Sequence, residues 1–197
     1  MPRKPRQLVD GGCYHLIARG NNRCCVFADD DAFRYFLNCL GRLKKRHQAK
    51  LYHYCLMSNH IHLLLEITSG EELPKLMQKL LQGYGRWHQK RRAYIGHVWQ
   101  GRYKSPLITR ESYFLEAGRY IERNPLRADM VSDLREYSWS SYRYYAHGVD
   151  DDLVDTDPYY PQLGRTASAR QEAYRQFVRI ASPYDRFLDH EFLGRPF

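Results

Sequence analysis

Two histidines in one short segment have the spacing that metal binding requires. His60 and His62 lie two residues apart in residues 60–66, whose apolar composition is typical of a β-strand. Side chains two apart on a strand project from the same face, so both imidazoles share one face and the apolar residues between them share the other. Two neutral imidazoles can bind one divalent ion when a further ligand completes the site. Two unrelated strand histidines, one of them hydrogen-bonded in the core, are the alternative interpretation.

A tyrosine and an asparagine form a second pair with functional spacing. Tyr120 and Asn124 lie four residues apart in a segment expected to be helical, so they share one helix face, with Glu116 one turn earlier. Phe114 and Ile121 supply the apolar side of that helix, which leaves Tyr120 free to face a ligand. The competing interpretation is a packed tyrosine with its hydroxyl at the surface. Because the chain contains 17 tyrosines, spacing alone does not distinguish Tyr120 from the others.

Basic and aromatic side chains alternate between residues 86 and 104. This segment contains six Lys or Arg residues, no acidic residue, and the aromatic residues Trp87, Tyr94, Trp99 and Tyr103. Cations suit a phosphate backbone and aromatic faces suit bases, which is the combination that single-stranded nucleic acid needs. A solvated helix end beside core aromatics is the alternative.

The net charge of +9 is unevenly distributed. Residues 1–127 carry 23 Lys or Arg and 10 Asp or Glu, a balance of +13, whereas residues 128–197 carry 8 and 12, a balance of −4. A basic body with a mildly acidic tail favours a polyanionic partner, because each neutralised phosphate releases condensed counterions. A solvated basic surface would give the same numbers, so charge favours nucleic acid only modestly.

The elements that must position these residues can be read from periodicity and turn signals. Apolar residues alternate in the expected strands and recur at helical spacing in the expected helices, and Pro125 is expected to end the last helix of the body at Asn124. The predicted elements are strand 13–18, helix 30–48, strand 51–57, strand 60–66, helix 71–92, a final strand near 104–109 and helix 111–124. This order predicts an α+β, ferredoxin-like split βαβ fold. Its antiparallel sheet has helices on one face, leaving the other face open to a ligand.

The chain divides into three predicted regions. Residues 1–12 form an N-terminal arm, residues 13–147 a catalytic domain, and residues 148–197 a C-terminal tail with an exposed acidic loop and a short helix near residues 168–180. Five cysteines without a Cys-x-x-Cys pair indicate free thiols in a reducing compartment. No apolar run reaches membrane-spanning length and no apolar segment follows the basic N-terminus. We therefore expect a cytoplasmic protein without a secretory signal.

Four segments, taken in order, add a family resemblance to this reading. Residues 27–31, 56–65, 99–105 and 119–128 together resemble the single-tyrosine transposases with a His-hydrophobic-His motif, and in particular the REP-associated tyrosine transposases related to IS200. Residues 14–21 also fit the first strand of that family. Each motif alone is weak, but four in register are highly specific. The resemblance spans about residues 8–145.

The resemblance implies a mechanism and assigns roles to residues. His60 and His62 would be the ligands of Mg²⁺ or Mn²⁺, Tyr120 the nucleophile, and Asn124 a third metal ligand where relatives often have Gln. The substrate would be single-stranded DNA with hairpins, cut through a 5′-phosphotyrosine intermediate. A phenol with a pKa near its ordinary value of about 10 needs assistance, for which Glu116 or Glu122 are candidates. Relatives include monomers and homodimers, and the protein is expected to act at the bacterial nucleoid.

DNA contacts are expected along the basic aromatic segment and the end of the first strand. The expected residues are Arg19, Asn21, Arg86, Arg91, Arg92, Trp99, Arg102, Tyr103 and Lys104. The main alternative is a non-catalytic single-stranded nucleic-acid-binding protein that uses an open ferredoxin-like sheet. A metal-dependent nuclease that activates water and a replication or conjugation relaxase are two further alternatives. The nuclease that activates water leaves Tyr120 without a role, and the short body and the single motif tyrosine favour the transposase over a relaxase.

Overall fold

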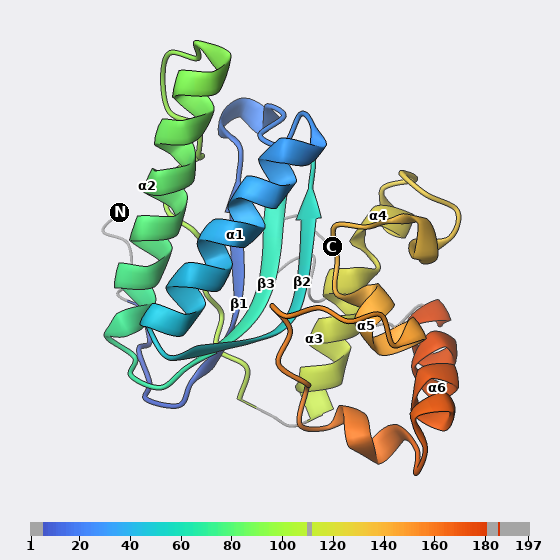
Figure 1. Ribbon diagram of the computed structural model, residues 1–197. Coiled ribbons are helices and arrows are strands. Elements are labelled where there is room, and N and C mark those ends of the chain that lie inside the picture. Colours follow the sequence, from blue (N-terminus) through green and yellow to red (C-terminus); the bar gives the residue numbers. More distant parts are fainter. Residues whose placement is uncertain (1–5, 110–111, 181–184, 186–197) are drawn as a thin grey trace.

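The computed structural model describes residues 6–109, 112–180 and 185 (Figure 1). Residues 1–5 of the expected arm, residues 110–111, and residues 181–184 and 186–197 of the expected tail lie outside the described residues. The strands are β1 (Cys13–Arg19), β2 (Ala49–Met57) and β3 (His60–Ile67). The helices are α1 (Asp30–Arg46), α2 (Glu72–Arg92), α3 (Ser112–Glu122), α4 (Asn124–Arg127), α5 (Tyr142–His147) and α6 (Ala167–Arg179). Short 3₁₀ turns are η1 (Asn21–Arg23), η2 (Leu134–Glu136) and η3 (Tyr160–Leu163).

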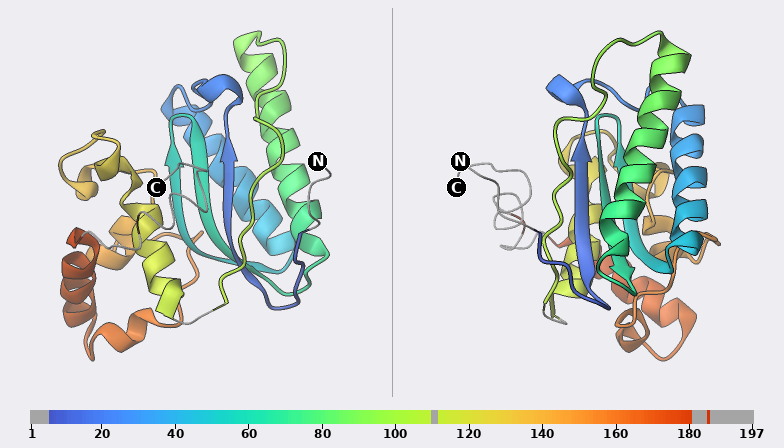
Figure 2. Two further views of the ribbon diagram at one scale, coloured as in Figure 1. Left: turned by 180° about the vertical axis from the view of Figure 1, so that it is seen from behind. Right: turned by 90° about the vertical axis from the view of Figure 1, so that its left-hand side faces the viewer.

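The sheet has the antiparallel order β1-β3-β2, with the histidine-bearing strand β3 in the centre. In this register His60 lies opposite Arg19 of β1, and His62 lies opposite Ile17. The predicted final strand is not regular. Residues 99–107 run along the free edge of β1 and form isolated bridges with it, such as Ile17 to Lys104, together with further single backbone hydrogen bonds (Figure 2). Pro106, which lacks a backbone N–H, interrupts continuous pairing at this edge.

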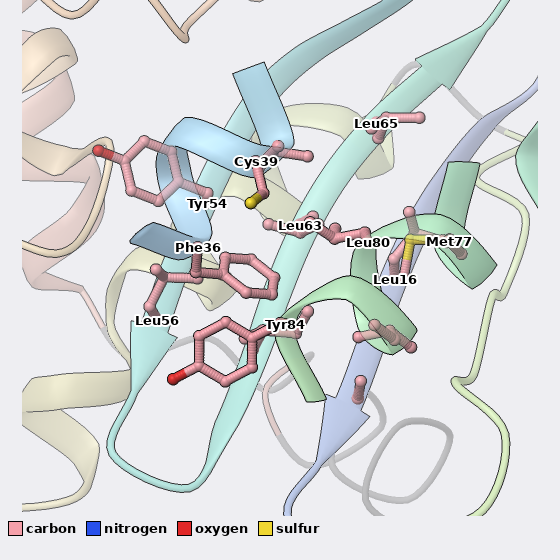
Figure 3. Close-up of a cluster of buried hydrophobic side chains, with 14 of the residues drawn as sticks. Leu16, Phe36, Cys39, Tyr54, Leu56, Leu63, Leu65, Met77, Leu80 and Tyr84 are labelled. Atoms are coloured by element: carbon pink, nitrogen blue, oxygen red, sulfur yellow. The ribbon is translucent and has the colours of Figure 1, made fainter. Parts of the chain in front are cut away.

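One face of the sheet is covered by α1 and α2, as predicted for the α+β split βαβ fold (Figure 1). Leu16 of β1 and Leu63 and Leu65 of β3 project into this layer, because alternate residues of a strand share a face. They meet Phe36 of α1 and Leu80 of α2 in a fully buried core (Figure 3). The side chain of Asp29 accepts a hydrogen bond from the backbone N–H of Ala32 and so caps the start of α1.

The second face of the sheet is not entirely open, which corrects the sequence-based expectation. Helix α3 is amphipathic, and it buries Phe114, Ala117 and Ile121 against Ile17 and Leu64 of the strands. An apolar helix face has to be covered, and the exposed part of the sheet supplies the matching surface. A ligand that approaches this face therefore meets α3 as well as the sheet.

Gly118 allows α3 to lie very close to β2. A Cβ atom at this position would lie 2.5 Å from Nε2 of His53, well inside ordinary contact. Helix α3 ends at Glu122, and α4 begins at Asn124 with Pro125 in its first turn. Proline is tolerated there because the N–H groups of a first helical turn have no partner within the helix. The predicted helix end near Asn124 is therefore confirmed to within two residues.

The described part of the C-terminal tail packs against the body. Tyr145, Tyr160 and Tyr174 form a third buried cluster with neighbouring apolar side chains of α5 and α6. The backbone N–H of Asp155 donates to the carbonyl of Leu51 at the β2 edge (2.8 Å). The helix predicted near residues 168–180 is confirmed as α6.

The acidic loop of the tail is not simply exposed, contrary to the sequence prediction. Asp157 is completely buried, and its carboxylate lies 3.0 Å from Nε2 of His53. The ammonium group of Lys44 donates to Asp155 (2.6 Å). Both aspartates pair with basic residues of α1 and β2, which lie about a hundred residues earlier in the chain.

Two further expectations concern cysteines and membranes. All five cysteines are free thiols, as predicted, and Cys13, Cys39 and Cys55 are buried. Within the described ranges, no helix combines the length and the apolar composition needed to cross a bilayer.

Candidate active site

The two histidines of β3 lie on one face of the sheet, as their spacing predicts. Their ring centroids are 5.0 Å apart. His62 is completely buried, whereas His60 is partly exposed and its Nδ1 lies 2.6 Å from the side-chain oxygen of Asn59. Burial, with smaller contributions from the neighbouring histidines and arginines, holds the pKa of His62 well below its ordinary range. His62 is therefore neutral, the form in which an imidazole binds a metal.

A third histidine joins this pair from β1. Nε2 of His15 lies 2.9 Å from Nδ1 of His62, and the two rings are 5.1 Å apart. Burial lowers the pKa of His15 to about 3, so this ring is also neutral. Sequence reasoning assigned His15 to the first strand but gave it no role. The available signal was alternation, which places His15 and Ile17 on the same face of β1.

Tyr120 lies against the histidines. Its ring centroid is 5.8 Å from that of His15 and 5.9 Å from that of His62, and the side chain is completely buried. The guanidinium carbon of Arg127 lies 5.1 Å from the centre of the Tyr120 ring, a cation–π distance. The structure therefore brings Tyr120 of α3 beside the histidine pair of β3, from which it is far apart in the sequence.

Asn124 is tied to the end of helix α3. Its side-chain nitrogen donates to the carbonyls of Tyr120 (2.9 Å) and Ile121 (3.1 Å), and the residue is buried. Only its amide oxygen is a possible metal donor in this orientation. Across the described ranges there is no cluster of three or more His, Cys, Asp or Glu side chains arranged to hold a metal.

The two glutamates considered as helpers of Tyr120 have other partners. Glu116 accepts a hydrogen bond from Arg119 (2.6 Å). Glu122 is completely buried and accepts hydrogen bonds from Ser141 (2.5 Å) and Tyr174 (2.7 Å). Its carboxylate also lies 2.9 Å from Nδ1 of His53. Neither carboxylate is available to Tyr120 in this arrangement.

His53 is held between Glu122 of α3 and Asp157 of the tail. Burial lowers the pKa of His53, but hydrogen bonds to Asp157 and Glu122 outweigh this effect and raise it to about 9. The imidazole is therefore a buried cation between two carboxylates. This network joins β2, the helix that carries Tyr120, and the C-terminal tail.

Four of the residues expected to bind DNA line one cleft. The cleft lies between α2 and residues 96–103 and has a volume of about 880 Å³. Arg86, Trp99, Arg102 and Tyr103 all line it. The indole N–H of Trp99 donates to the carbonyl of Leu81 (2.9 Å), so this ring is held by the core and does not project as an exposed stacking platform.

The remaining expected DNA contacts fall into two groups. Arg19, Asn21 and Lys104 lie along β1 and its edge, where Lys104 exchanges backbone hydrogen bonds with Ile17. Arg91 and Arg92 lie at the end of α2 and pair with acidic residues at the start of α1. The shortest of these ion pairs joins Arg92 to Asp29 (2.6 Å).

Fold and site together define a class of protein. An α+β sheet that presents two histidines beside a tyrosine on a neighbouring helix could hold a divalent ion next to a phenolic oxygen. Residues 9–124 match the family described as "Transposase IS200 like". The chain belongs to this family and is therefore a DNA-cleaving and rejoining transposase. Transposases of this type generally need a divalent metal ion.

A solved structure supports the same fold. A REP-associated tyrosine transposase bound to a REP hairpin is 15% identical, with a TM-score of 0.62 over 80% of this chain and 93% of that chain. A putative transposase from Deinococcus radiodurans is 20% identical, with a TM-score of 0.43 over 66% of this chain and 92% of that chain. No curated protein sequence matches this chain.

Proposed function

We propose that this transposase cuts single-stranded DNA next to hairpins, with Tyr120 as the nucleophile and His60 and His62 as metal ligands. One observation supports the assignment above all others. The ring of Tyr120, which is buried, lies 5.9 Å from that of His62, within the segment that matches the transposase family. A tyrosine that only packs in the core would not need a histidine as its neighbour, because its ring would pack equally well against aliphatic side chains.

The histidines fit a divalent ion. Nε2 of His62 is buried and has no hydrogen-bond partner among the described residues, which is costly for a polar atom unless something else binds there. His60 provides a second imidazole on the same face. Mg²⁺ or Mn²⁺ bound by this pair would stabilise the charge that develops on the scissile phosphate. The amide oxygen of Asn124 is the candidate for a third protein ligand.

His15 acts as a positioning residue for His62. If Nδ1–H of His62 donates to Nε2 of His15, the lone pair of His62 remains on Nε2, where the metal would be held. The opposite arrangement would put a proton on Nε2 of His62 and block it. Partners behind a ligating imidazole commonly fix its tautomer and orientation in this way.

Tyr120 carries out the covalent step. Its phenolic oxygen forms a bond to phosphorus and the bond from phosphorus to the 3′ oxygen breaks. The proton that the phenol loses passes through solvent to the departing 3′ oxygen, which leaves as a hydroxyl. The resulting 5′-phosphotyrosine is a diester, so a second 3′ hydroxyl can reverse the attack and rejoin the strand without ATP. The guanidinium of Arg127 over the ring favours the negative charge that grows on the phenolic oxygen.

The DNA would approach along the edge of β1. Arg19 lies opposite His60, and Asn21 and Lys104 follow the same edge. The solved relative with the higher TM-score is bound to a REP hairpin, which supports hairpin DNA as the substrate. Arg91 and Arg92 are left out of this path because acidic residues already pair with them. The enzyme would act at the bacterial nucleoid, as a monomer or a homodimer.

The test is a search for the covalent adduct. A single-stranded hairpin oligonucleotide is labelled at either its 5′ or its 3′ end, incubated with the protein and Mn²⁺, and run on a denaturing gel. We expect the 3′ label to migrate with the protein and the 5′ label to appear in a free fragment. Tyr120→Phe should abolish the adduct and leave DNA binding nearly unchanged.

Tyr137→Phe is the matched control, because Tyr137 belongs to the same buried cluster as Tyr120 but donates its hydroxyl to the carbonyl of Leu56. This variant should still form the adduct. An adduct formed by Tyr120→Phe would refute the assignment of the nucleophile. Tight DNA binding without any adduct in the unmodified protein would favour the non-catalytic binding alternative.

A further inference from the structure

A cationic cleft lies at the edge of the sheet, outside the histidine and tyrosine site. We define the α2 cleft by its position between α2 and residues 96–103, and its volume of about 880 Å³ is within the range of ligand pockets. Its floor is apolar and includes Met77, Leu81 and Val98. Residues 96–103 line this cleft opposite α2 and are joined to the end of β1 by the bridge between Gly20 and Trp99; the left view of Figure 2 shows the segment beside α2.

Helix α2 presents a polar row to this cleft. Gln78, Gln82 and Arg86 are spaced four residues apart, so they lie on one face of the helix, and all three are exposed. The core face of the same helix is apolar and includes Leu76 and Leu80. The polar row is therefore not needed for packing.

The charge of the cleft has one sign. Arg6, Arg86 and Arg102 line it, and none of the described residues that line it is acidic. The guanidinium of Arg6 lies 3.9 Å from the centre of the Tyr103 ring, so the far wall combines a cation with an aromatic surface. A ligand that suits this lining has negative charge at its rim and a flat body with polar edges.

The side-chain amides add a further requirement. Each glutamine offers both a donor and an acceptor, which is the pattern that matches the edge of a nucleobase. An apolar floor suits the face of the base, and arginines suit the adjoining phosphates. A simple anion would leave Gln78, Gln82 and the apolar floor without a role.

The α2 cleft connects with the active-site face along the edge of β1. The backbone N–H of Gln100 donates to the carbonyl of Arg19 (2.8 Å), and Arg19 lies opposite His60 in the sheet register. A strand that passes His60 therefore reaches residues 100–103 by crossing one strand edge.

We propose that the α2 cleft holds an unpaired nucleotide of the DNA strand that is cut. The base lies on the apolar floor with its edge toward Gln78 and Gln82, and the flanking phosphates contact Arg86 and Arg102. This inference rests on the proposed function, because it takes the strand at His60 to be DNA. The α2 cleft would be a second site, besides the active site, at which the protein binds the strand.

The first experiment compares two variants that each change the net charge by −1. Fluorescein-labelled (dT)₁₂ is titrated with protein without metal, and anisotropy gives the affinity. Gln82→Glu places a negative charge in the cleft and should weaken binding about tenfold or more. Lys79→Gln removes a positive charge from the same helix at a position that does not line the cleft, and should weaken it less than about twofold. Equal effects would overturn the proposal, because they would reflect only long-range charge.

The second experiment locates the base directly. A (dT)₁₂ carrying one 5-iodouracil is irradiated with the unmodified protein, and the crosslinked peptides are identified. Crosslinks within residues 78–86 or 96–103 are expected, and crosslinks found only elsewhere would overturn the proposal. Both residues substituted in the first experiment are exposed, and equal thermal midpoints will show that the variants are folded.

The outcomes separate this inference from the catalytic proposal. If the Tyr120 adduct forms normally but Gln82→Glu binds like Lys79→Gln, the cleft assignment fails and the catalytic one stands. If no Tyr120 adduct forms but Gln82→Glu loses binding selectively, the catalytic assignment fails and the cleft stands.

Discussion

Two glycines in helices provide a matched test of how α3 is positioned. Gly83 lies in α2, and a Cβ atom added there would meet nothing within 4 Å. Gly118 lies in α3, and a Cβ atom there would approach the His53 ring at 2.5–2.7 Å, about 1 Å short of a normal contact. Alanine is intrinsically better than glycine in a helix by about 1 kcal/mol at either position.

The His53 ring cannot easily yield to a new methyl group. Its Nδ1 lies 2.9 Å from Glu122 and its Nε2 lies 3.0 Å from Asp157, so a rotation would break contacts on both sides of a buried cation. Overpacking of a core costs about 1–3 kcal/mol, and this fixed neighbour favours the upper part of that range. We therefore expect Gly83→Ala to stabilise the protein by about 0.5–1 kcal/mol and Gly118→Ala to destabilise it by about 1–2 kcal/mol net.

Urea unfolding followed by circular dichroism measures both free energies. Because Gly118 lies two residues before Tyr120, Gly118→Ala should also slow formation of the Tyr120 adduct, whereas Gly83→Ala should leave it unchanged. If both alanine variants were equally stabilised, the close approach of α3 to β2 would be refuted. The contact between Gly118 and the His53 ring would then not determine the distance between α3 and the sheet.

Three further predictions address the histidines and Arg127. Calorimetric titration without DNA should show that His15→Leu weakens Mn²⁺ binding about 10- to 100-fold, while His15→Gln, which keeps an acceptor, weakens it less; equal losses would contradict the tautomer argument. Because the pKa of His53 is raised from 6.5 to about 9, its contribution to stability is complete below pH 6.5 and is lost as pH rises through about 9. The free energy of unfolding should fall by about 3 kcal/mol over this range, and His53→Gln should remove this pH dependence; an unchanged slope in the variant would assign it to other groups. Arg127→Met should slow adduct formation up to about tenfold without changing Mn²⁺ affinity, and an unchanged rate would exclude a role for the guanidinium.

Local sequence patterns were sufficient to predict the elements around the site. Alternation in residues 60–66 placed His60 and His62 on one face, and helical spacing with an acidic N-cap located α1. The fourth strand was predicted from its composition and is irregular, because Pro106 cannot donate to a ladder. The irregularity of this strand therefore has a cause, Pro106, that can be read from the sequence.

Contacts between distant residues could not be predicted in the same way. His15 was missed because its position beside His62 depends on the β1–β3 register, which no short-range pattern specifies. The sequence predicts an exposed Asp157, because nothing in its acidic segment points to its partner His53, which lies 104 residues earlier. Tyr120 was singled out only by family resemblance, since the chain offers 17 tyrosines and each has a reasonable packing explanation.

The burial of Tyr120 has a consequence for selectivity. Its side chain is fully buried, so the proposed attack requires a shift that uncovers its oxygen. Strand binding must supply the work for that shift, and a weakly held strand supplies too little. On the proposed mechanism, a transposase with this arrangement would cut tightly held strands in preference to weakly held ones.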